Sequence, residues 1–217
     1  MNIKILYDNQ AENGFLSGWG FSALVDGTTL FDVGERVDSL RKNMAAFGVD
    51  PQTITRVALS HEHWDHVGGI GILADMKKVH VYLPAAFTDR FKQKIPKINP
   101  NATVVEVDGL TPMGNGLYAT PQLNGKRWEI SLAIEHPEGI VLIVGCSHPG
   151  LDRILEEAKK LGPIQAIIGG FHGFKKLEAL DGIPVLGPTH CTRKKKAIRK
   201  LYPTQTHLLA AGMEMDL

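Results

Sequence analysis

Short apolar runs separated by turn residues dominate the chain, a pattern typical of β-strands. Residues 21–31 predict two strands joined at Asp26-Gly27, a dipeptide favoured in hairpin turns. A second hairpin is predicted over 128–145, with its turn at Pro137-Glu138-Gly139. Single strands are expected at residues 2–7, 55–60, 79–83, 103–107, 164–168, 183–187 and 207–211.

Helical spacing of apolar residues appears in fewer places. It predicts helices over 36–47 and 150–161, a short helix between residues 168 and 183, and a basic helix over 193–200. The Pro- and Lys-rich segment 92–100 is expected to be an exposed loop. A strand-rich first half followed by alternating helices and strands favours an α/β fold with two sheets packed face to face and helices outside. We expect one domain over residues 1–217.

Composition narrows the classes of protein that fit. Hydrophobic residues make up 43% and charged residues 22% of the chain, which argues against a disordered or coiled-coil protein. A formal net charge of +1 gives no general attraction for nucleic acid or anionic membranes. No signal-peptide core and no run of roughly 18 apolar residues is present, so we expect a cytoplasmic protein without a membrane partner. The two cysteines, Cys146 and Cys191, are expected to be thiols.

Histidines follow the predicted strands. Six of the nine stand immediately after an apolar strand segment: His61, His63, His66, His148, His172 and His190. The ends of neighbouring strands meet at one edge of a sheet, so these imidazoles are expected to converge. His80, His136 and His207 show no such placement and are interpreted as surface residues.

The densest group is the segment 60–69, SHEHWDHVGG. On a regular helix, His61 and His63 would point apart, so we expect an extended turn that places them on one side. A bend after His63 would then direct Asp65 and His66 to a second position beside the first. Imidazole and carboxylate suit zinc, iron or manganese. The alternative, a solvated polar turn, fits four ligand-type residues in six positions poorly.

The spacing His61-x-His63-x-Asp65-His66, followed by single histidines at 148 and 190, resembles the metallo-β-lactamase-fold hydrolase superfamily. The resemblance covers nearly the whole chain and implies a four-layer αββα sandwich of two mixed sheets. It implies two divalent metal ions, zinc being favoured over iron or manganese. One ion would be held by His61, His63 and His148, and the other by Asp65, His66 and His190. Asp32 matches the buried aspartate that supports the metal loop in this family.

Three further segments narrow the resemblance to the branch of dihydropterin ribofuranosyl-aminobenzene phosphate synthase-like proteins: 145–150, 169–172 and 188–192. The chain departs from the superfamily at His172, which stands where most members have a carboxylate that bridges both metals. An imidazole nitrogen has one lone pair and cannot bridge two ions as a carboxylate does. Either a hydroxide alone bridges the metals, or one metal site is weak.

The expected activity is that of a metal-dependent hydrolase using a metal-bound hydroxide. Asp65 is expected to orient that hydroxide, and His172 to act as a further ligand or as a general acid. A basic rim of Lys175, Arg193 and Lys194 favours a small anionic substrate, a phosphodiester or a phosphate-bearing pterin-like compound.

Other functions fit the same residues. The scaffold also suits a thioester or lactone hydrolase, or an iron-dependent dioxygenase. Residues 193–200 alternatively form a charged helix face or a nucleic-acid-binding surface, although the low net charge disfavours nucleic acid. A non-catalytic metal-binding protein is a further alternative, because the usual bridging carboxylate is missing.

Overall fold

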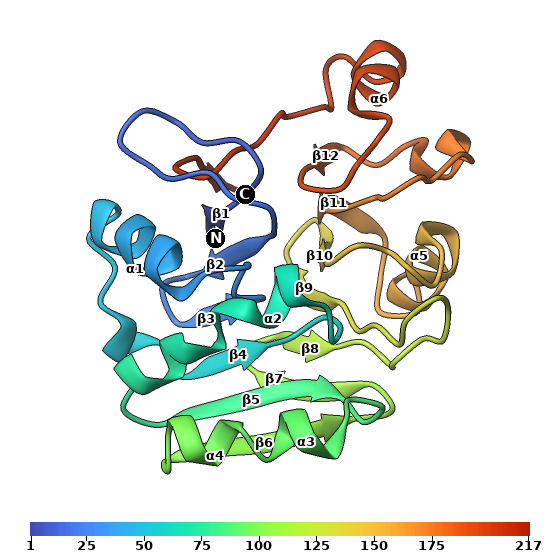
Figure 1. Ribbon diagram of the computed structural model, residues 1–217. Coiled ribbons are helices and arrows are strands. Elements are labelled where there is room, and N and C mark those ends of the chain that lie inside the picture. Colours follow the sequence, from blue (N-terminus) through green and yellow to red (C-terminus); the bar gives the residue numbers. More distant parts are fainter. The chain divides into compact units, whose positions relative to one another are not determined.

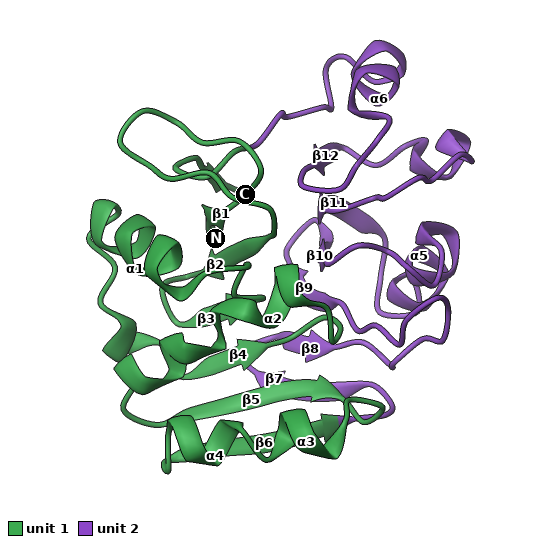
Figure 2. Ribbon diagram, in the orientation of Figure 1, with its two compact units in different colours: residues 1–106, 210–217 green, residues 107–209 purple.

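The computed structural model describes residues 1–217, and the chain divides into two compact units. Unit 1 comprises residues 1–106 and 210–217, and unit 2 comprises residues 107–209 (Figure 2). Each unit has its own mixed sheet, its own helices and its own core (Figure 1). None of the helices combines the length and the apolar character that a bilayer span requires.

Unit 1 contains a seven-stranded sheet in the order β13-β1-β2-β3-β4-β5-β6. Its strands are β1 (Asn2–Tyr7), β2 (Ser22–Val25), β3 (Thr29–Phe31), β4 (Arg56–Ala58), β5 (Val79–Pro84), β6 (Ala102–Val107) and β13 (Glu214–Asp216). β6 ends on the first residue of unit 2. The pairs from β13 to β3 are antiparallel, whereas β3, β4 and β5 are parallel. The carboxyl ends of β3, β4 and β5 therefore lie at one edge.

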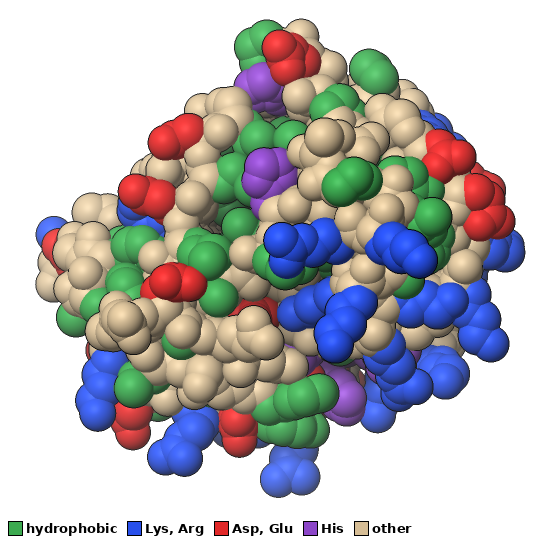
Figure 3. Space-filling model, turned by 90° about the horizontal axis from the view of Figure 1, so that it is seen from above, with side chains coloured by type: hydrophobic (Ala, Val, Ile, Leu, Met, Phe, Trp, Pro, Cys, Tyr) green, Lys and Arg blue, Asp and Glu red, His purple; other side chains and the backbone are tan.

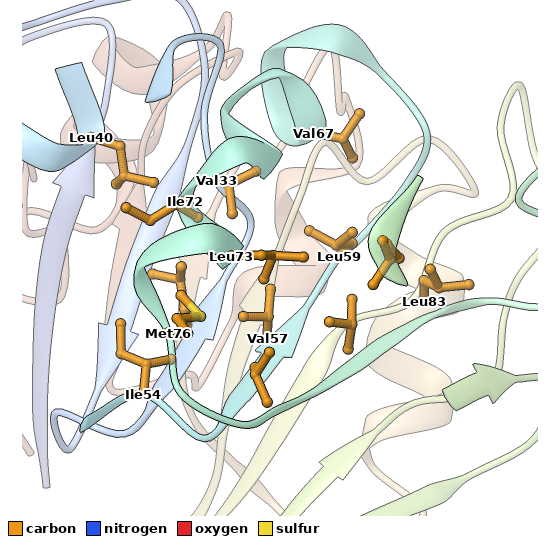
Figure 4. Packing of buried hydrophobic residues seen from close by; sticks show 14 of the residues in the cluster. Val33, Leu40, Ile54, Val57, Leu59, Val67, Ile72, Leu73, Met76 and Leu83 are labelled. Carbon is orange, nitrogen blue, oxygen red and sulfur yellow. The ribbon is translucent and has the colours of Figure 1, made fainter. Parts of the chain in front are cut away.

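The core of unit 1 lies between this sheet and its helices, which are α1 (Val37–Ala46), α2 (Trp64–Val67), α3 (Asp89–Lys92), α4 (Ile95–Ile98) and the 3-10 helices η1 (Pro51–Thr53) and η2 (Gly68–Asp75). Figure 4 shows Val57 and Leu59, from β4 and the residues after it, packed beside Leu73 of η2. All three side chains are fully buried. This packing fixes the segment that continues from β4 into the histidine motif.

Unit 2 contains a six-stranded sheet in the order β12-β11-β10-β9-β8-β7. Its strands are β7 (Thr111–Gly114), β8 (Leu117–Ala119), β9 (Leu132–His136), β10 (Gly139–Val144), β11 (Ile164–Gly169) and β12 (Val185–Pro188). β10, β11 and β12 are parallel neighbours, and β7 to β10 pair antiparallel. The helices are α5 (Leu151–Ala158), the 3-10 helix η3 (Leu177–Leu180) and α6 (Lys195–Leu201).

Helix α5 joins β10 to β11 and covers one face of the sheet of unit 2. Its buried residues Leu151, Ile154 and Leu155 recur at helical spacing and pack against the apolar side chains of β10 and β11. A parallel crossover of this kind brings each strand's carboxyl end to the same edge. The loops that follow β10, β11 and β12 therefore lie together.

Most predicted elements are confirmed. The first hairpin is β2 and β3, with Asp26 and Gly27 at φ of 45° and 65°, the left-handed pair that a type I′ turn requires. The second is β9 and β10. The helices predicted over 36–47, 150–161 and 193–200 are α1, α5 and α6. The sequence pattern does not predict β7 and β8, because β7 contains Pro, Gly and exposed residues and β8 is only three residues long.

Two predictions are wrong. Residues 207–211 form no strand: single bridges join Thr206 to Leu186 and Ala211 to Ala11, and β13 pairs with β1 instead. The segment 92–100 is no exposed loop, because it contains α4, whose Ile95 is fully buried in the core of unit 1. Proline stands in the first turn of α4, where its missing N–H costs no helical hydrogen bond.

Candidate metal centre

In unit 1, the histidine motif begins where β4 ends. His61 lies two residues after Leu59, and His63 is the N-cap of α2 in an extended conformation. The backbone N–H of His63 donates to the carbonyl of His61 at 2.9 Å, which closes a tight non-helical turn. Asp65 and His66 follow in the first turn of α2. The extended turn expected from the sequence is therefore present.

This turn brings the donor atoms of the motif together. One ring nitrogen of His61 and one of His63 lie within 4.8 Å of each other, as do a carboxylate oxygen of Asp65 and a ring nitrogen of His66. The carboxylate of Asp65 is 3.1 Å from Nδ1 of His63 and 3.8 Å from Nε2 of His66. These distances show that the two oxygens of Asp65 face two different histidines. The Asp65 side chain is buried.

A fully buried carboxylate, Asp32, supports the motif from the end of the neighbouring parallel strand β3. It accepts from the backbone N–H and the hydroxyl of Ser60, each at 2.7 Å. The same carboxylate lies 2.7 Å from Nδ1 of His66. A carboxylate at Nδ1 keeps the proton on that nitrogen and leaves the Nε2 lone pair available as a ligand. Ser60 Oγ also lies 2.9 Å from Nδ1 of His61.

The glycine pair after the motif, Gly68-Gly69, allows two segments of unit 1 to pack closely. Gly68 has a helical φ of −62°, so no special backbone conformation is needed there. A Cβ on Gly68 would lie 2.2 Å from the carbonyl oxygen of Glu35, and a Cβ on Gly69 would lie 2.1 Å from that of Val33. Glycine is required because α2 and η2 pass directly against the loop that carries Asp32.

In unit 2, His148, His172 and His190 follow the parallel neighbours β10, β11 and β12. Two of them, His172 and His190, have φ of 44° and 43°, and Ser147 beside His148 has φ of 57°. Residues other than glycine adopt this left-handed region at a cost, and such residues gather at functional sites. The three loops thus share one edge of the sheet and the same backbone strain.

Glu129 organises the loop after β10, and sequence reasoning missed it. Its side chain is buried. One oxygen accepts from the N–H groups of Cys146 and Ser147 at 2.9 and 2.8 Å, and the other accepts from the N–H of His148 at 2.8 Å. No motif marks a single glutamate at the start of the hairpin predicted over 128–145, so only the fold reveals this contact.

His172 lies beside His148, with ring centroids 5.2 Å apart. A hydrogen bond to Cys191 raises the pKa of His172, while burial and the positive charges of Arg193 and Lys126 act in the opposite direction. Cys191 is partly buried and is a polar partner of His172. Both cysteines are thiols, as expected.

Unit 2 also contains a pocket of about 280 Å³ beside these histidines. His148, His172 and Arg193 line it, together with Lys126, which sequence reasoning missed. Lys175 and Lys194, the other two residues of the expected basic rim, are exposed or partly exposed and do not line this pocket. Figure 3 shows Lys and Arg side chains gathered on one part of a face of the molecule.

The donor set fits a metal centre. Imidazole nitrogens and carboxylate oxygens are ligands that zinc, iron and manganese accept. In unit 1 these donors converge, and Asp32 and Ser60 hold the other sides of two imidazoles. In unit 2, a sulfur of Cys146 and a ring nitrogen of His190 lie within 4.8 Å of each other. The His, Asp and Cys side chains are thus compatible with metal binding.

Comparisons with known proteins agree with this chemistry. Residues 20–173 match the profile of the Metallo-beta-lactamase superfamily. An uncharacterised protein of Methanocaldococcus jannaschii is 28% identical, covering 78% of this chain and 78% of that protein. The 7,8-dihydropterin-6-methyl-4-(beta-D-ribofuranosyl)-aminobenzene-5'-phosphate synthase of the same organism is 26% identical, covering 79% of this chain and 78% of that protein.

A solved structure of a metal-dependent hydrolase of the beta-lactamase superfamily is similar over 100% of this chain and 99% of its own, with a TM-score of 0.83 and 26% identity. The predicted α/β fold class is therefore confirmed, and so is the resemblance to the synthase-like proteins. The profile match spans well over half of the sequence. The chain belongs to the metallo-β-lactamase superfamily.

Proposed function

We propose that the protein is a metal-dependent hydrolase that acts on a small anionic substrate, with a phosphodiester or a phosphate-bearing pterin-like compound favoured. One observation carries the proposal: ligand-type side chains stand after the carboxyl ends of parallel strands in both units of a chain that belongs to the metallo-β-lactamase superfamily. A packing role would not require six such residues at strand ends.

The proposed ligands form two sets. His61, His63 and His148 would hold one ion, and Asp65, His66 and His190 would hold the other. The donor distances within unit 1 support the pairing of His61 with His63 and of Asp65 with His66. Zinc is the favoured metal because most of these donors are imidazoles, which are common zinc ligands, and iron or manganese are the alternatives.

Divalent ions at this centre would lower the pKa of a bound water and polarise the reacting oxygen of the substrate. The residues of the chain would do the rest. Asp65 would accept a hydrogen bond from the attacking water and orient it. His172 would donate a proton to the leaving group, and its hydrogen bond to Cys191 raises its pKa in the direction that keeps it protonated. Asp32 would hold His66 in the tautomer that ligates.

The phosphate preference is supported by the similarity to the synthase, whose name contains a phosphate and a dihydropterin, and by the basic residues near His172. That relative is named a synthase, so its name does not support hydrolysis. Hydrolysis is proposed here from the donor set of the metal centre and from the superfamily. The pocket of unit 2 has no acidic lining residue, which also favours an anion.

The test combines metal analysis with activity. We expect the purified protein to contain up to two divalent ions and to hydrolyse bis(p-nitrophenyl) phosphate. His66→Ala should lose most of this activity and metal, whereas His80→Ala, an exposed residue of β5, should retain both. Hydrolysis of lactones or thioesters without phosphodiester turnover would refute the phosphate preference. Bound iron together with substrate-dependent oxygen uptake would favour a dioxygenase. Metal binding without turnover of any substrate would favour a non-catalytic role.

A further inference from the structure

We propose that the pocket of unit 2 binds an aromatic ring that carries a phosphoryl group, and that Lys126 and Arg193 hold the phosphoryl oxygens. The inference deepens the proposed function and rests on it for the reaction that follows binding. The pocket has a volume of about 280 Å³. Ligand pockets commonly span about 300–1,000 Å³, so this one suits a phosphoryl group and one ring.

Two cations line the pocket. Lys126 comes from the loop between β8 and β9, and Arg193 from the loop between β12 and α6. Both carry positive charge close enough to the imidazole of His172 to act on it. The pocket has no Asp or Glu among its lining residues. A dianion such as a phosphate monoester gains from two cations and meets no opposing charge.

Lys126 stands on an anchored loop although its side chain is exposed. A Cβ on its neighbour Gly125 would lie 2.4 Å from the carbonyl oxygen of His148 and 2.6 Å from Cα of Pro149. Only glycine allows the loop to pass so close to the His148 backbone. The carbonyl of Asn124 also accepts from the guanidinium of Arg153 at 2.7 Å. These contacts place Lys126 at a defined point beside His148.

Arg193 is anchored in the same way. Its backbone N–H donates to the carbonyl of His172 at 2.9 Å. The preceding residue, Thr192, is buried and accepts from the N–H of Phe171 at 2.8 Å. The loop after β12 is thus tied to the loop after β11 at two consecutive positions. Preorganised cations lose less conformational entropy on binding than cations on mobile loops.

Apart from the imidazoles of His148 and His172, the rest of the pocket wall is apolar or small. Phe171 is buried, and Phe174 is half-buried, with its N–H donating to the carbonyl of Phe171 at 3.0 Å. Gly150 and Gly173 present no side chain at the wall. Phe171 is closed off by the core, so the half-buried side chain of Phe174 is the aromatic group of the wall on which a ligand ring would stack. The wall therefore selects a flat apolar group attached to the phosphoryl group over a free inorganic ion.

The test is a binding measurement with phenylphosphonate, whose carbon–phosphorus bond resists hydrolysis. Isothermal titration calorimetry on the purified full-length protein should give saturable binding. Lys126→Met and Arg193→Met should each raise the dissociation constant about tenfold, because each removes a charge-assisted hydrogen bond. Lys159→Met, an exposed lysine at the end of α5, is the matched control and should change it less than twofold. Circular dichroism should show unchanged folding of all three variants.

Several results would overturn the inference: no binding to the unmodified protein, wild-type affinity of Lys126→Met, or equal affinity for methylphosphonate, which lacks the ring. The outcome separates from that of the proposed function. Binding through Lys126 without hydrolysis of any phosphodiester, lactone or thioester would retain the pocket and refute the hydrolase. Phosphodiester hydrolysis together with wild-type affinity of Lys126→Met for phenylphosphonate would refute the proposed pocket and retain the proposed hydrolase.

Discussion

At the scale of single residues, Asp32 is where a small change should affect the metal centre without removing a ligand. Asp32→Asn keeps the size of the side chain but removes the charge that holds the Nδ1 proton of His66. We expect metal affinity to fall about 10- to 100-fold, as for other groups that orient a ligating histidine. Competition with a chromophoric chelator measures this affinity.

The control for Asp32 is Asp75→Asn, which removes the charge of a partly exposed carboxylate paired with Arg41 in the same unit. Its metal affinity should equal that of the unmodified protein. If Asp32→Asn also retained full metal affinity, the hydrogen bond to His66 would have only a structural role. Asp32 would then not support the proposed metal centre.

Glu129 is a second single residue with a measurable role. Glu129→Gln would present an NH₂ group to backbone N–H donors that now share the carboxylate. A buried donor left without an acceptor costs about 1–3 kcal/mol, so the free energy of unfolding should fall by that amount. Urea denaturation measures the loss. Glu135→Gln, at an exposed carboxylate of β9, should change the unfolding free energy by less than about 0.5 kcal/mol.

At the scale of elements, periodicity identified those helices and strands whose buried face repeats regularly. α5 and β10 are examples, because apolar residues there recur at helical spacing or fill the whole strand. Periodicity failed where tertiary contacts decide the structure. In the Pro- and Lys-rich segment 92–100, Ile95 packs α4 onto the core of unit 1. At the C-terminal end of the chain, β13 forms a strand in place of the one expected over 207–211. Neither contact partner is adjacent in sequence.

The close approach of η2 to the loop after β3 supports a prediction about this element. A Cβ on Gly69 would lie 2.1 Å from the carbonyl oxygen of Val33, so Gly69→Ala must push η2 away from the loop. We expect a loss of about 1–3 kcal/mol in the free energy of unfolding, typical of overpacked sites. Thermal and urea denaturation measure it. Gly109→Ala, where nothing lies within 4 Å of the added carbon, should be close to neutral. Equal stability of both variants would contradict the packing described here.

At the scale of the whole molecule, the sequence identified the ligand candidates because imidazoles after apolar strands form a recognisable pattern. It did not identify Glu129, Lys126 or the Cys191 contact with His172, because each depends on which loops become neighbours at a sheet edge. That residues 1–217 form one domain stays a prediction. The two units are compact by themselves, each with its own core.

The proposed ligand sets draw on both units, and this gives a prediction for the stability of the whole chain. A metal that binds only the folded protein stabilises it by about 2.7 kcal/mol when its free concentration is 100 times the dissociation constant. Zinc should therefore raise the melting temperature, and a chelator should reverse the rise. His190→Ala in unit 2 should reduce the gain, whereas His207→Ala, an exposed residue of the same unit, should leave it intact. If His190→Ala kept the full zinc-dependent rise in melting temperature while His66→Ala abolished it, the four ligand-type residues of unit 1 would by themselves account for metal binding. The pairing of ligands across the two units would then be wrong, because a ligand that contributes no metal-binding free energy has no place in the centre.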